Sequence, residues 1–532
     1  MYRDVSLLDC TLRDGGYVND WNFGHSVITS TYKRLSSSRV DYIEVGFIDD
    51  RRKFDINRSI VPNTRCFNTI FKDVNKGDAI PVAMIDFGTC SIENISDVSE
   101  TFIDGIRVIF KKEKIQDALP FCKEIKNKGY KLFIQAISIT SYSDMEMLEY
   151  IEKINEIEPY AFSIVDTYGL LDEKKLTNYF RLMDNNLKSH IKLGYHGHNN
   201  FQLAFSNSIK FLSLDTKRSL IVDATVYGMG KSAGNCAIEL MAMHMNSQYE
   251  KNYDVNQYLE ILDSELMSIY MKKNWGYRYN FFISALQNCH PNYVSFLLEK
   301  KTLSVTDINT ILGDIPIEDR LLYDEDLIEI KYKQFQSKQL HDSSKDLFEL
   351  KKKIKHRSIL LLGPGKSIIT ELPAVKHYIQ SENPIIITVN FISDLYNSDY
   401  IFISNAKRFN KLMDENKIKI EKLIVTSNVA IFDNISAFRL NYQELLGEGN
   451  NKSDSALLLI LSALRKMEAA KVCLAGFDGF LGSSEDYYKI SYSFGDNEDF
   501  NLRLNTKISE GIKFWRQQGL NINFITKSLY EK

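Results

Sequence analysis

The first 240 or so residues alternate between short apolar runs and longer segments of helical character. Each run is rich in β-forming residues and nearly continuous in its hydrophobicity, which is typical of strands buried on both faces. The intervening segments, such as 141–157, are long enough for helical crossovers between parallel strands. The eight runs are 5–10, 40–47, 80–87, 104–110, 131–139, 161–169, 191–199 and 219–228. Eight such units predict a (β/α)8 TIM barrel over residues 1–250, with an open doubly wound sheet as the alternative.

A second series of strand-like runs begins at residue 358. The runs are 358–368, 384–391, 400–405, 422–429, 437–442, 470–480 and 521–526. Helical segments separate several of them, so residues 358–532 are expected to form a doubly wound, Rossmann-like α/β domain. Between the two series, residues 251–345 look helical and charged and predict an extension that forms a lid or dimer contacts. Residues 346–357 predict an exposed linker.

Composition narrows the class of protein. The formal net charge is −3, from 66 basic and 69 acidic residues, so nucleic acid is not an expected partner. The seven cysteines are scattered singly without a CxxC pair, which predicts neither a disulfide framework nor a zinc ribbon. No export signal and no run of about 18 apolar residues is present, so we expect a soluble, cytoplasmic protein without a membrane partner.

Polar residues gather toward the carboxyl ends of the first eight runs, where a TIM barrel builds its active site. They are Asp14, Glu44, Asp86, Gln135, Asp166, His196, His198 and Asp223. An all-structural explanation would have to bury many carboxylates there without purpose. We therefore expect an active site at this end, with some of these side chains orienting others.

The sharpest feature is Y-H-G-H-N-N at 195–200. Strand positions two apart project to the same side, so His196 and His198 are expected to share the barrel mouth. Together with Asp14 they would offer two nitrogens and one oxygen to a divalent metal and leave coordination positions open. Asn235, in a Gly-rich stretch, could complete the set. A hydrogen-bonded histidine pair and a plain Gly-rich loop are the alternatives.

This ligand set favours Mn or Mg, with Zn and Co also open. A 2-oxo acid could chelate such a metal through its carboxylate and keto oxygens, which lowers the cost of forming an enolate. Arg13 could then donate hydrogen bonds to the developing enolate oxygen. A salt bridge with a neighbouring strand-end carboxylate is the alternative role for Arg13.

Five motifs in fixed order, D-C-T-L-R-D-G-G, I-E-V-G, D-T-Y-G, H-G-H-N and G-M-G-K-S-A-G-N, closely resemble the DRE-TIM metallolyase, or HMG-CoA-lyase-like, superfamily. The resemblance covers roughly residues 1–300. It implies a TIM barrel that makes or breaks carbon-carbon bonds next to a carbonyl. Asp14, His196 and His198 would be the metal ligands, Asn235 a ligand in some branches, and Arg13 the enolate stabiliser.

Within that superfamily, the R-D-G-G-Y opening looks most like the 4-hydroxy-2-oxovalerate aldolase branch. The implied reaction joins a pyruvate-type 2-oxo acid to an aldehyde, or cleaves the product. A Claisen-type acyltransferase using acyl-CoA is one alternative, and a non-catalytic protein that binds a sugar nucleotide is another. Substrate contacts are expected from Glu44, Gln135, Asp166, Thr167 and Lys231.

The sequence departs from the family at several positions. The aldolases carry a histidine shortly after the R-D-G turn, and here Tyr17 is the nearest candidate acid or base, or a substrate-lining residue. Lys231 stands where the family more often has a small or acidic residue, and it could bind a carboxylate or phosphate or face solvent. His290, in the aromatic segment 275–293, is a further catalytic candidate, although the segment could instead pack a dimer interface. A homodimer or larger assembly is expected.

The second domain opens with G-P-G-K-S at 363–367. A Walker loop needs glycine where Leu360 stands, and the dinucleotide fingerprint needs glycine at Ile368, so neither motif is present. The loop could still offer backbone N–H groups to a phosphate, with a plain tight turn as the alternative.

The order of short motifs in this domain loosely resembles the sialyltransferase-like Rossmann domains of surface-glycan loci. The resemblance implies a bound nucleotide or sugar nucleotide, and a bifunctional protein in polysaccharide biosynthesis. The expected ligand residues are Gly363, Gly365, Lys366, Ser367, Asn390, Asn405, Asn428 and Asp478. No histidine follows His377, so transferase activity is not expected.

Overall fold

The structure is a computed structural model of the 532-residue chain. It describes residues 4–300, 303–337, 342–414, 422–429, 431, 437–446, 454–480 and 498–531. The chain divides into two compact units, Met1–Val294 with Ile317–Tyr323, and Ser295–Pro316 with Asp324–Lys532. The helical segment 251–345 is thus shared between the two units.

The first unit contains a closed barrel of eight parallel strands. They are β1 (Val5–Asp9), β2 (Tyr42–Ile48), β4 (Ile80–Asp86), β5 (Gly105–Ile109), β6 (Lys131–Ala136), β7 (Ala161–Asp166), β8 (Lys192–Gly197) and β9 (Leu220–Ala224). Their order around the barrel is β1-β9-β8-β7-β6-β5-β4-β2, and pairing of β1 with β2 closes it. The two-residue strand β3 (Ile60–Val61) adds to the outer end of β2. The predicted TIM barrel is confirmed.

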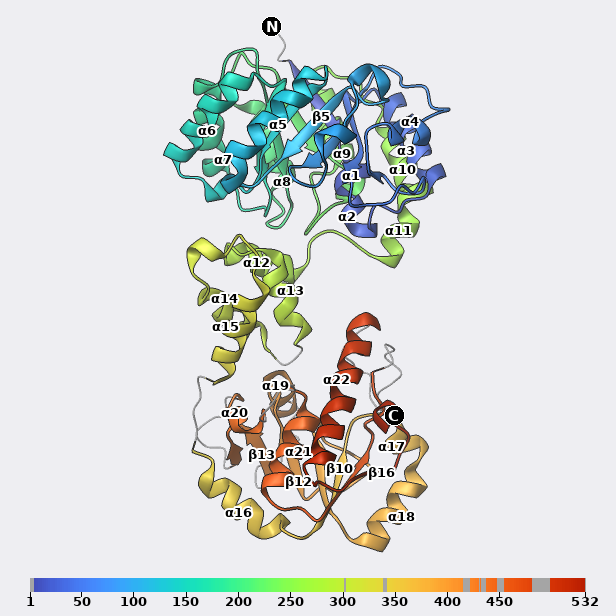
Figure 1. Cartoon of the computed structure of the whole chain (residues 1–532), viewed down its shortest axis with the longest axis vertical. Coiled ribbons are helices and arrows are strands. Elements are labelled where there is room, and N and C mark those ends of the chain that lie inside the picture. The colour runs from blue at the N-terminus through green and yellow to red at the C-terminus, as the bar shows by residue number, and fades with distance from the viewer. Residues whose placement is uncertain are drawn as a thin grey trace. The chain divides into compact units, whose positions relative to one another are not determined.

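Helices surround the barrel (Figure 1). They are α3 (His25–Ser37), α4 (Cys66–Ile70), α5 (Ile115–Asn127), α6 (Asp144–Ile157), α7 (Glu173–Asn186), α8 (Ala204–Ser213), α9 (Ile238–Gln248) and α10 (Val255–Ile261). Local sequence fixes where some of them begin. Ser143 and Glu146 form a reciprocal capping box at α6, and Asp172 caps α7 by accepting from Lys175 N.

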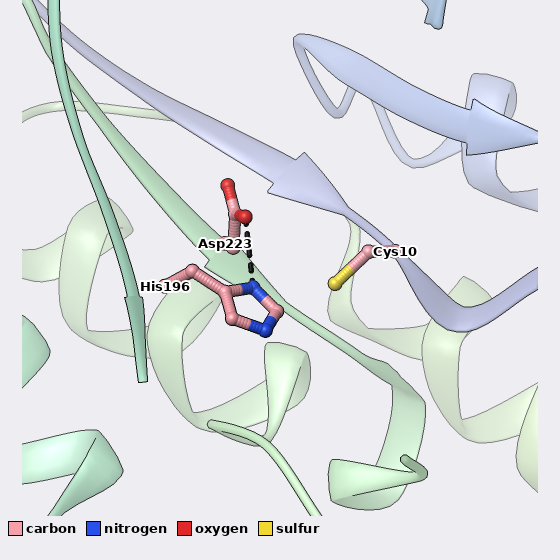
Figure 2. Close-up of side chains that lie close together, drawn as sticks. All are labelled: Cys10, His196 and Asp223. Carbon is pink, nitrogen blue, oxygen red and sulfur yellow. Dashed lines mark hydrogen bonds and ion pairs between the residues drawn. The ribbon is translucent and has the colours of Figure 1, made fainter. Parts of the chain in front are cut away.

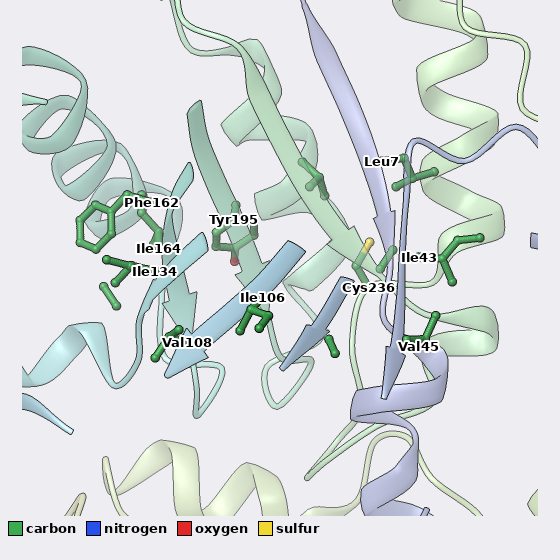
Figure 3. Close-up of a cluster of buried hydrophobic side chains, with 14 of the residues drawn as sticks. Leu7, Ile43, Val45, Ile106, Val108, Ile134, Phe162, Ile164, Tyr195 and Cys236 are labelled. Atoms are coloured by element: carbon green, nitrogen blue, oxygen red, sulfur yellow. The ribbon is translucent and has the colours of Figure 1, made fainter. Parts of the chain in front are cut away.

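Strand alternation separates an apolar outer face from a partly polar interior. Side chains such as Ile43, Ile106 and Phe162 point outward and pack under the helices in the main core (Figure 3). Their neighbours one residue on face the barrel axis, as register pairs such as Arg107 with Phe133 require. This alternation places Glu44, Arg107, Gln135, His196 and Asp223 inside the barrel.

The second unit is built on a seven-stranded parallel sheet of order β14-β13-β12-β11-β10-β15-β16. The strands are β10 (Ser358–Leu362), β11 (Ile385–Val389), β12 (Tyr400–Ile403), β13 (Leu423–Thr426), β14 (Phe438–Leu440), β15 (Lys471–Ala475) and β16 (Ile522–Phe524). The strand order reverses between β10 and β15, as in a doubly wound fold. The predicted Rossmann-like architecture is confirmed.

Helices cover both faces of this sheet. One face packs against α16 (Ser344–Ile354), α21 (Ala456–Lys466) and α22 (Glu498–Gln517), and the other against α18 (Leu372–Glu382) and α19 (Ala406–Asp414). Two short helices, α17 (Ser367–Thr370) and α20 (Tyr442–Leu445), lie near strand ends. The segment expected to be a linker, 346–357, lies largely in α16, where Leu350 and Ile354 are buried in the core.

Five further helices follow the barrel along the chain and precede the first strand of the sheet. They are α11 (Met267–Lys272), α12 (Tyr279–Leu286), α13 (Pro291–Glu299), α14 (Val305–Gly313) and α15 (Glu325–Ser337). Within the described ranges, no helix combines the length and the apolar character needed to span a bilayer.

Candidate active site and metal centre

The turn after β1 carries Arg13 and Asp14 in the short helix α1 (Thr11–Asp14). Two glycines follow because the turn is tightly packed. A Cβ at Gly15 would lie 2.3 Å from the Thr11 carbonyl oxygen, and one at Gly16 would lie 2.0 Å from the Trp21 ring. Trp21 in turn donates its indole N–H to the Arg13 carbonyl at 2.8 Å. The Gly-Gly pair therefore allows the close packing that positions Arg13 and Asp14.

His196 and His198 lie at the carboxyl end of β8 with their ring centroids 5.1 Å apart. His196 Nδ1 lies 2.9 Å from Asp223 Oδ2, and His198 Nδ1 lies 3.2 Å from the Gly234 carbonyl. Each Nδ1 that donates to an oxygen leaves Nε2 as the free ligand nitrogen. Such outer partners are the usual way that proteins fix the tautomer and ring orientation of metal-ligating histidines.

Asp14, His196 and His198 converge, since one ligand atom from each lies within 4.8 Å of the others. His196 Nε2 is 3.7 Å from Asp14 Oδ2, and all three residues are at most 5% exposed. Burial alone would raise the pKa of Asp14, but the adjacent Arg13 guanidinium and the two imidazoles hold it well below its usual range. Burial lowers the pKa of His198 to about 4, so its imidazole is neutral at pH 7. An ionised carboxylate beside a neutral imidazole is the protonation state that metal binding requires.

The loop after β9 completes the site. Asp14 Oδ1 accepts hydrogen bonds from Lys231 N at 2.9 Å and from Asn235 Nδ2 at 3.0 Å. Asn235 Oδ1 is buried and has no hydrogen-bond partner among the described residues. An orphaned amide oxygen next to a carboxylate and two free imidazole nitrogens fits a divalent cation as the missing partner.

A chain of buried ion pairs supports these ligands. Arg13 donates from Nη1 to Asp14 and from Nε to Glu44 Oε2 at 2.6 Å. Glu44 Oε2 is also 3.0 Å from Nη1 of Arg107, whose Nη2 donates to Asp223, the partner of His196. Arg107, which is 1% exposed, thus connects Glu44, the partner of Arg13, with Asp223, the partner of His196.

Arg107 was not among the predicted site residues, and Asp223 had no specific predicted role. The signal for Arg107 was a charged residue inside the apolar run 104–110, which a buried strand tolerates only when the charge is paired. Asp223 stood among the strand-end carboxylates, but its pairing with His196 depends on the neighbouring positions of β8 and β9 in the barrel.

A second group, Cys10, His196 and Asp223, also satisfies a simple distance test for metal binding (Figure 2). It is the weaker candidate. Its carboxylate oxygen already accepts from both His196 and Arg107, and the Cys10 thiol donates to the Ala224 carbonyl at 3.4 Å. Burial also raises the pKa of Cys10 well above its ordinary value, which disfavours the thiolate that a metal would need.

Tyr17, Lys231 and His290 were proposed as site residues, and the structure shows what surrounds each of them. Tyr17 is 38% exposed, yet burial of its hydroxyl raises its pKa to about 12. Lys231 Nζ lies 5.4 Å from the centroid of the Tyr17 ring. His290 packs against Tyr168, with ring centroids 5.5 Å apart. Burial first, then the charges of Lys231 and Lys111, lower the pKa of His290 to about 4.

The other expected substrate contacts have described bonds within the protein. Gln135 Oε1 accepts from Arg107 Nη2 at 3.1 Å, while its Nε2 has no partner among the described residues. Asp166 accepts from the backbone N–H groups of Leu170 and Leu171, and Thr167 Oγ1 accepts from Ser138 N. Asp166 and Thr167 therefore shape loops, and a role in substrate binding stays a prediction.

In the second unit, the expected ligand residues form two groups. In the first, Gly363 N and Gly365 N donate to the carbonyls of Ala475 and Gly476, each at 2.8 Å. Asp478 Oδ2 accepts from Ser367 N at 2.8 Å, and the Ser367 hydroxyl also donates to this carboxylate. The protein's own carboxylate thus takes the backbone donor that a phosphate would have used. Lys366 is exposed beside this loop.

The second group follows β11, β12 and β13. Asn390 Oδ1 accepts from Ser404 N at 3.0 Å, and Asn428 Nδ2 donates to Ser404 O at 3.2 Å. Asn405 caps α19 by accepting from Arg408 N at 3.1 Å. These bonds tie neighbouring strand ends together, and nucleotide binding by this unit stays a prediction.

The fold and the site define a TIM barrel with a buried carboxylate and two histidines suited to a divalent cation at the carboxyl ends of its strands. Residues 4–264 match the family model described as HMGL-like. This part of the chain is therefore an HMGL-like domain of the DRE-TIM metallolyase superfamily, whose members bind a divalent metal.

Curated relatives align with about half of the chain. Oxaloacetate decarboxylase of Mycobacterium tuberculosis is 23% identical over 254 residues, which are 45% of this chain and 69% of that protein. 4-Hydroxy-2-oxovalerate aldolase of Geobacillus thermodenitrificans is 22% identical over 247 residues, 45% of this chain and 68% of that one. Homocitrate synthase of Methanocaldococcus jannaschii is 26% identical over 289 residues, which are 51% of this chain and 67% of that protein.

Among solved structures, the N-terminal domain of a candidate aldolase from Bacteroides vulgatus is 24% identical, with a TM-score of 0.47. The match covers 57% of this chain and 98% of that one. Hydroxymethylglutaryl-CoA lyase from Pseudomonas aeruginosa is 14% identical with a TM-score of 0.41, over 50% of this chain and 93% of that one.

Proposed function

We propose that the barrel is a metal-dependent aldolase that makes or cleaves a carbon-carbon bond between a pyruvate-type enolate and an aldehyde. The observation that carries the proposal is the convergence of Asp14, His196 and His198 at a buried point beside Arg13. A carboxylate, two imidazoles and an adjacent guanidinium are the groups that such chemistry needs at a carbonyl.

A divalent cation held by Asp14, His196 and His198, with Asn235 as a further ligand, would supply Lewis-acid polarisation of the keto group. The protein's own residues supply orientation and charge. Arg13 is fixed by Glu44 and Asp14 through Nε and Nη1, and nothing in the described part of the chain accepts a hydrogen bond from its Nη2. That nitrogen is free to donate to the substrate oxygen on which negative charge develops.

Atoms balance simply in the synthetic direction. A base removes a methyl proton from the 2-oxo acid, the methyl carbon bonds to the aldehyde carbon, and the aldehyde oxygen takes up a proton; cleavage is the reverse. With a pKa of about 12, Tyr17 stays protonated at neutral pH and suits the role of proton donor to that oxygen. His290 is neutral, and its Nδ1 accepts a hydrogen bond from Asn292 N at 3.1 Å, so Nε2 carries the proton and is available as a hydrogen-bond donor.

The relatives support a 2-oxo acid substrate, because two of them are named for reactions of oxaloacetate and 4-hydroxy-2-oxovalerate. The alternative proposal, a Claisen-type reaction with acyl-CoA, is suggested by the synthases among these relatives. The R-D-G-G-Y turn after the first strand, which resembles that of the 4-hydroxy-2-oxovalerate aldolases, favours the aldehyde reaction.

The test is exchange of the methyl protons of pyruvate in deuterated buffer, followed by NMR with and without Mn²⁺. We expect metal-dependent exchange in the wild-type protein and none in His196→Ala or Asp14→Asn. Adding acetaldehyde should give a 4-hydroxy-2-oxo acid, whereas acetyl-CoA should give no condensation product. No exchange at any metal concentration would refute the proposal, and condensation with acetyl-CoA alone would replace it with the Claisen reaction.

A further inference from the structure

Lys231 is a cation without a carboxylate partner next to the candidate metal centre. Its backbone N–H is hydrogen-bonded to Asp14 Oδ1 at 2.9 Å, so the residue begins at the site itself. Its ammonium lies 5.4 Å from the centroid of the Tyr17 ring, a cation-π contact with a side chain that is 38% exposed. In the described part of the chain, Lys231 forms no ion pair.

Lys111, two residues after β5, adds a second positive charge at the carboxyl end of the barrel strands. The charges of Lys231 and Lys111 both add to the lowering that burial causes in the pKa of His290, and both oppose the rise that burial causes in the pKa of Asp86. Lys111 is exposed and, like Lys231, pairs with no carboxylate of the described residues. His290 is neutral, and Asp14 is already engaged by Arg13. Asp86 faces both lysines, and it also feels the charges of Arg51 and Asp49.

A partly buried ammonium without a carboxylate partner, such as that of Lys231, is favoured by an anion that offsets its charge. We propose that Lys231, assisted by Lys111, binds a carboxylate or phosphate group carried by the aldehyde acceptor. The inference rests on the proposed aldolase function and narrows it to anionic aldehydes. The product would be a 4-hydroxy-2-oxo acid with a second negatively charged group.

The alternative is that Lys231 binds the carboxylate of the 2-oxo acid itself. The two assignments differ in which half-reaction they affect. Methyl-proton exchange needs the 2-oxo acid alone, whereas carbon-carbon bond formation also needs the acceptor. A variant that removes the ammonium should therefore leave exchange unchanged if the lysine serves the acceptor.

The experiment compares wild type with Lys231→Met and Lys231→Arg as full-length, Mn²⁺-loaded proteins. Acceptors are offered in charged and neutral form: succinic semialdehyde against butanal, and glycolaldehyde phosphate against glycolaldehyde. Lys192→Met is the matched control, because Lys192 also lies over aromatic rings, 4.9 Å from the Tyr160 centroid, but at the opposite end of β8. Calorimetric titration with succinate, which has the anionic group but no aldehyde, reports binding without turnover.

We expect Lys231→Met to lower kcat/KM for the charged acceptors by about ten- to a hundredfold, the size of one charge-assisted hydrogen bond. Neutral acceptors and pyruvate exchange should change less than about threefold, succinate binding should weaken in parallel, and Lys231→Arg should recover most of the loss. The carboxylate and phosphate pairs show which anion is preferred.

Three outcomes would overturn the inference. They are an equal loss for charged and neutral acceptors, a raised KM for pyruvate in the exchange reaction, and a wild-type preference for neutral aldehydes. Failure of the aldolase proposal looks different, since the wild-type protein would then show no exchange at all. A fall of the same size in Lys192→Met would mean that any lost surface charge produces the effect.

Discussion

Arg107 offers the sharpest test of the buried ion-pair chain, because one substitution should affect both stability and metal binding. Its guanidinium contacts Asp223, lies 3.0 Å from Glu44 Oε2, and donates to Gln135 Oε1 at 3.1 Å. Arg107→Met keeps the length and apolar stem of the side chain but removes the charge. Two fully buried carboxylates would then share only Arg13 and His196 as partners.

The expected loss of stability follows from that imbalance. Breaking a buried ion pair by removing one partner costs about 3–5 kcal/mol, since it leaves an uncompensated charge in a low-dielectric interior. Removing the charge of Glu44 as well, in Arg107→Met with Glu44→Gln, should recover part of the loss because the two effects are not additive for residues in one network.

The effect on metal binding is separate. Asp223 orients His196 through its Nδ1, and Arg107 holds Asp223. Loss of such an outer partner lowers metal affinity by about ten- to a hundredfold. We therefore expect Arg107→Met to weaken Mn²⁺ binding by this factor.

Unfolding can be followed by tryptophan fluorescence in a Trp515→Phe background, which leaves Trp21 and Trp275, both in the barrel unit, as the chain's tryptophans. Mn²⁺ affinity can be measured by calorimetry on the same proteins. Arg218→Met is the matched control, because Arg218 is another buried arginine of the barrel unit, paired with Asp184 at 3.0 Å. It should destabilise the barrel without changing Mn²⁺ affinity. Arg107→Met with wild-type stability and wild-type affinity would refute the reasoning.

Three further predictions concern metal, pH and the second unit. Chelation should lower the melting temperature of the barrel, since a cation at a hundred times its Kd stabilises by about 2.7 kcal/mol; an unchanged melting curve would argue against a native site. His290 has a folded-state pKa of about 4, below its unfolded value, so the free energy of unfolding should fall as the pH drops from about 6.5 to 4. In His290→Gln, that fall in the free energy of unfolding between pH 6.5 and 4 should be smaller by an amount on the order of 2 kcal/mol, measured by urea titrations at each pH. An unaltered fall would contradict the assignment. Asp478→Ala should destabilise the second unit by about 1 kcal/mol, because Ser367 N loses its acceptor. Urea unfolding followed at Trp515 measures this change. A stabilised variant would show instead that the carboxylate strains the loop.

The repeated strands and helices could be predicted from the sequence because each buried strand is a local run of apolar residues. All eight apolar runs of the first half became barrel strands, and the seven runs of the second half became the strands of the doubly wound sheet. The two-residue strand Ile60–Val61 was missed because so short a pairing leaves no periodic signal.

The convergence of Asp14, His196 and His198 also followed from sequence, since strand ends in a parallel barrel share one face. Their supporting partners did not. The contact of Arg107 with Asp223 spans 116 positions of the chain, and that of Ser367 with Asp478 spans 111. Such pairings depend on strand order and register, which local patterns do not encode. For the same reason, the sequence suggested that the loop at Ser367 binds a phosphate, and local patterns could not show that Asp478 accepts the hydrogen bond from Ser367 N.

The most direct test of the account is the position of a bound ion. A crystal of the full-length protein soaked with Mn²⁺ should show one anomalous-scattering peak within bonding distance of Asp14, His196 and His198, beside Asn235 Oδ1. The account predicts that peak in the wild-type protein and its loss in His198→Ala. A peak only at Cys10 and Asp223, or no peak near His196 at saturating Mn²⁺, would contradict it.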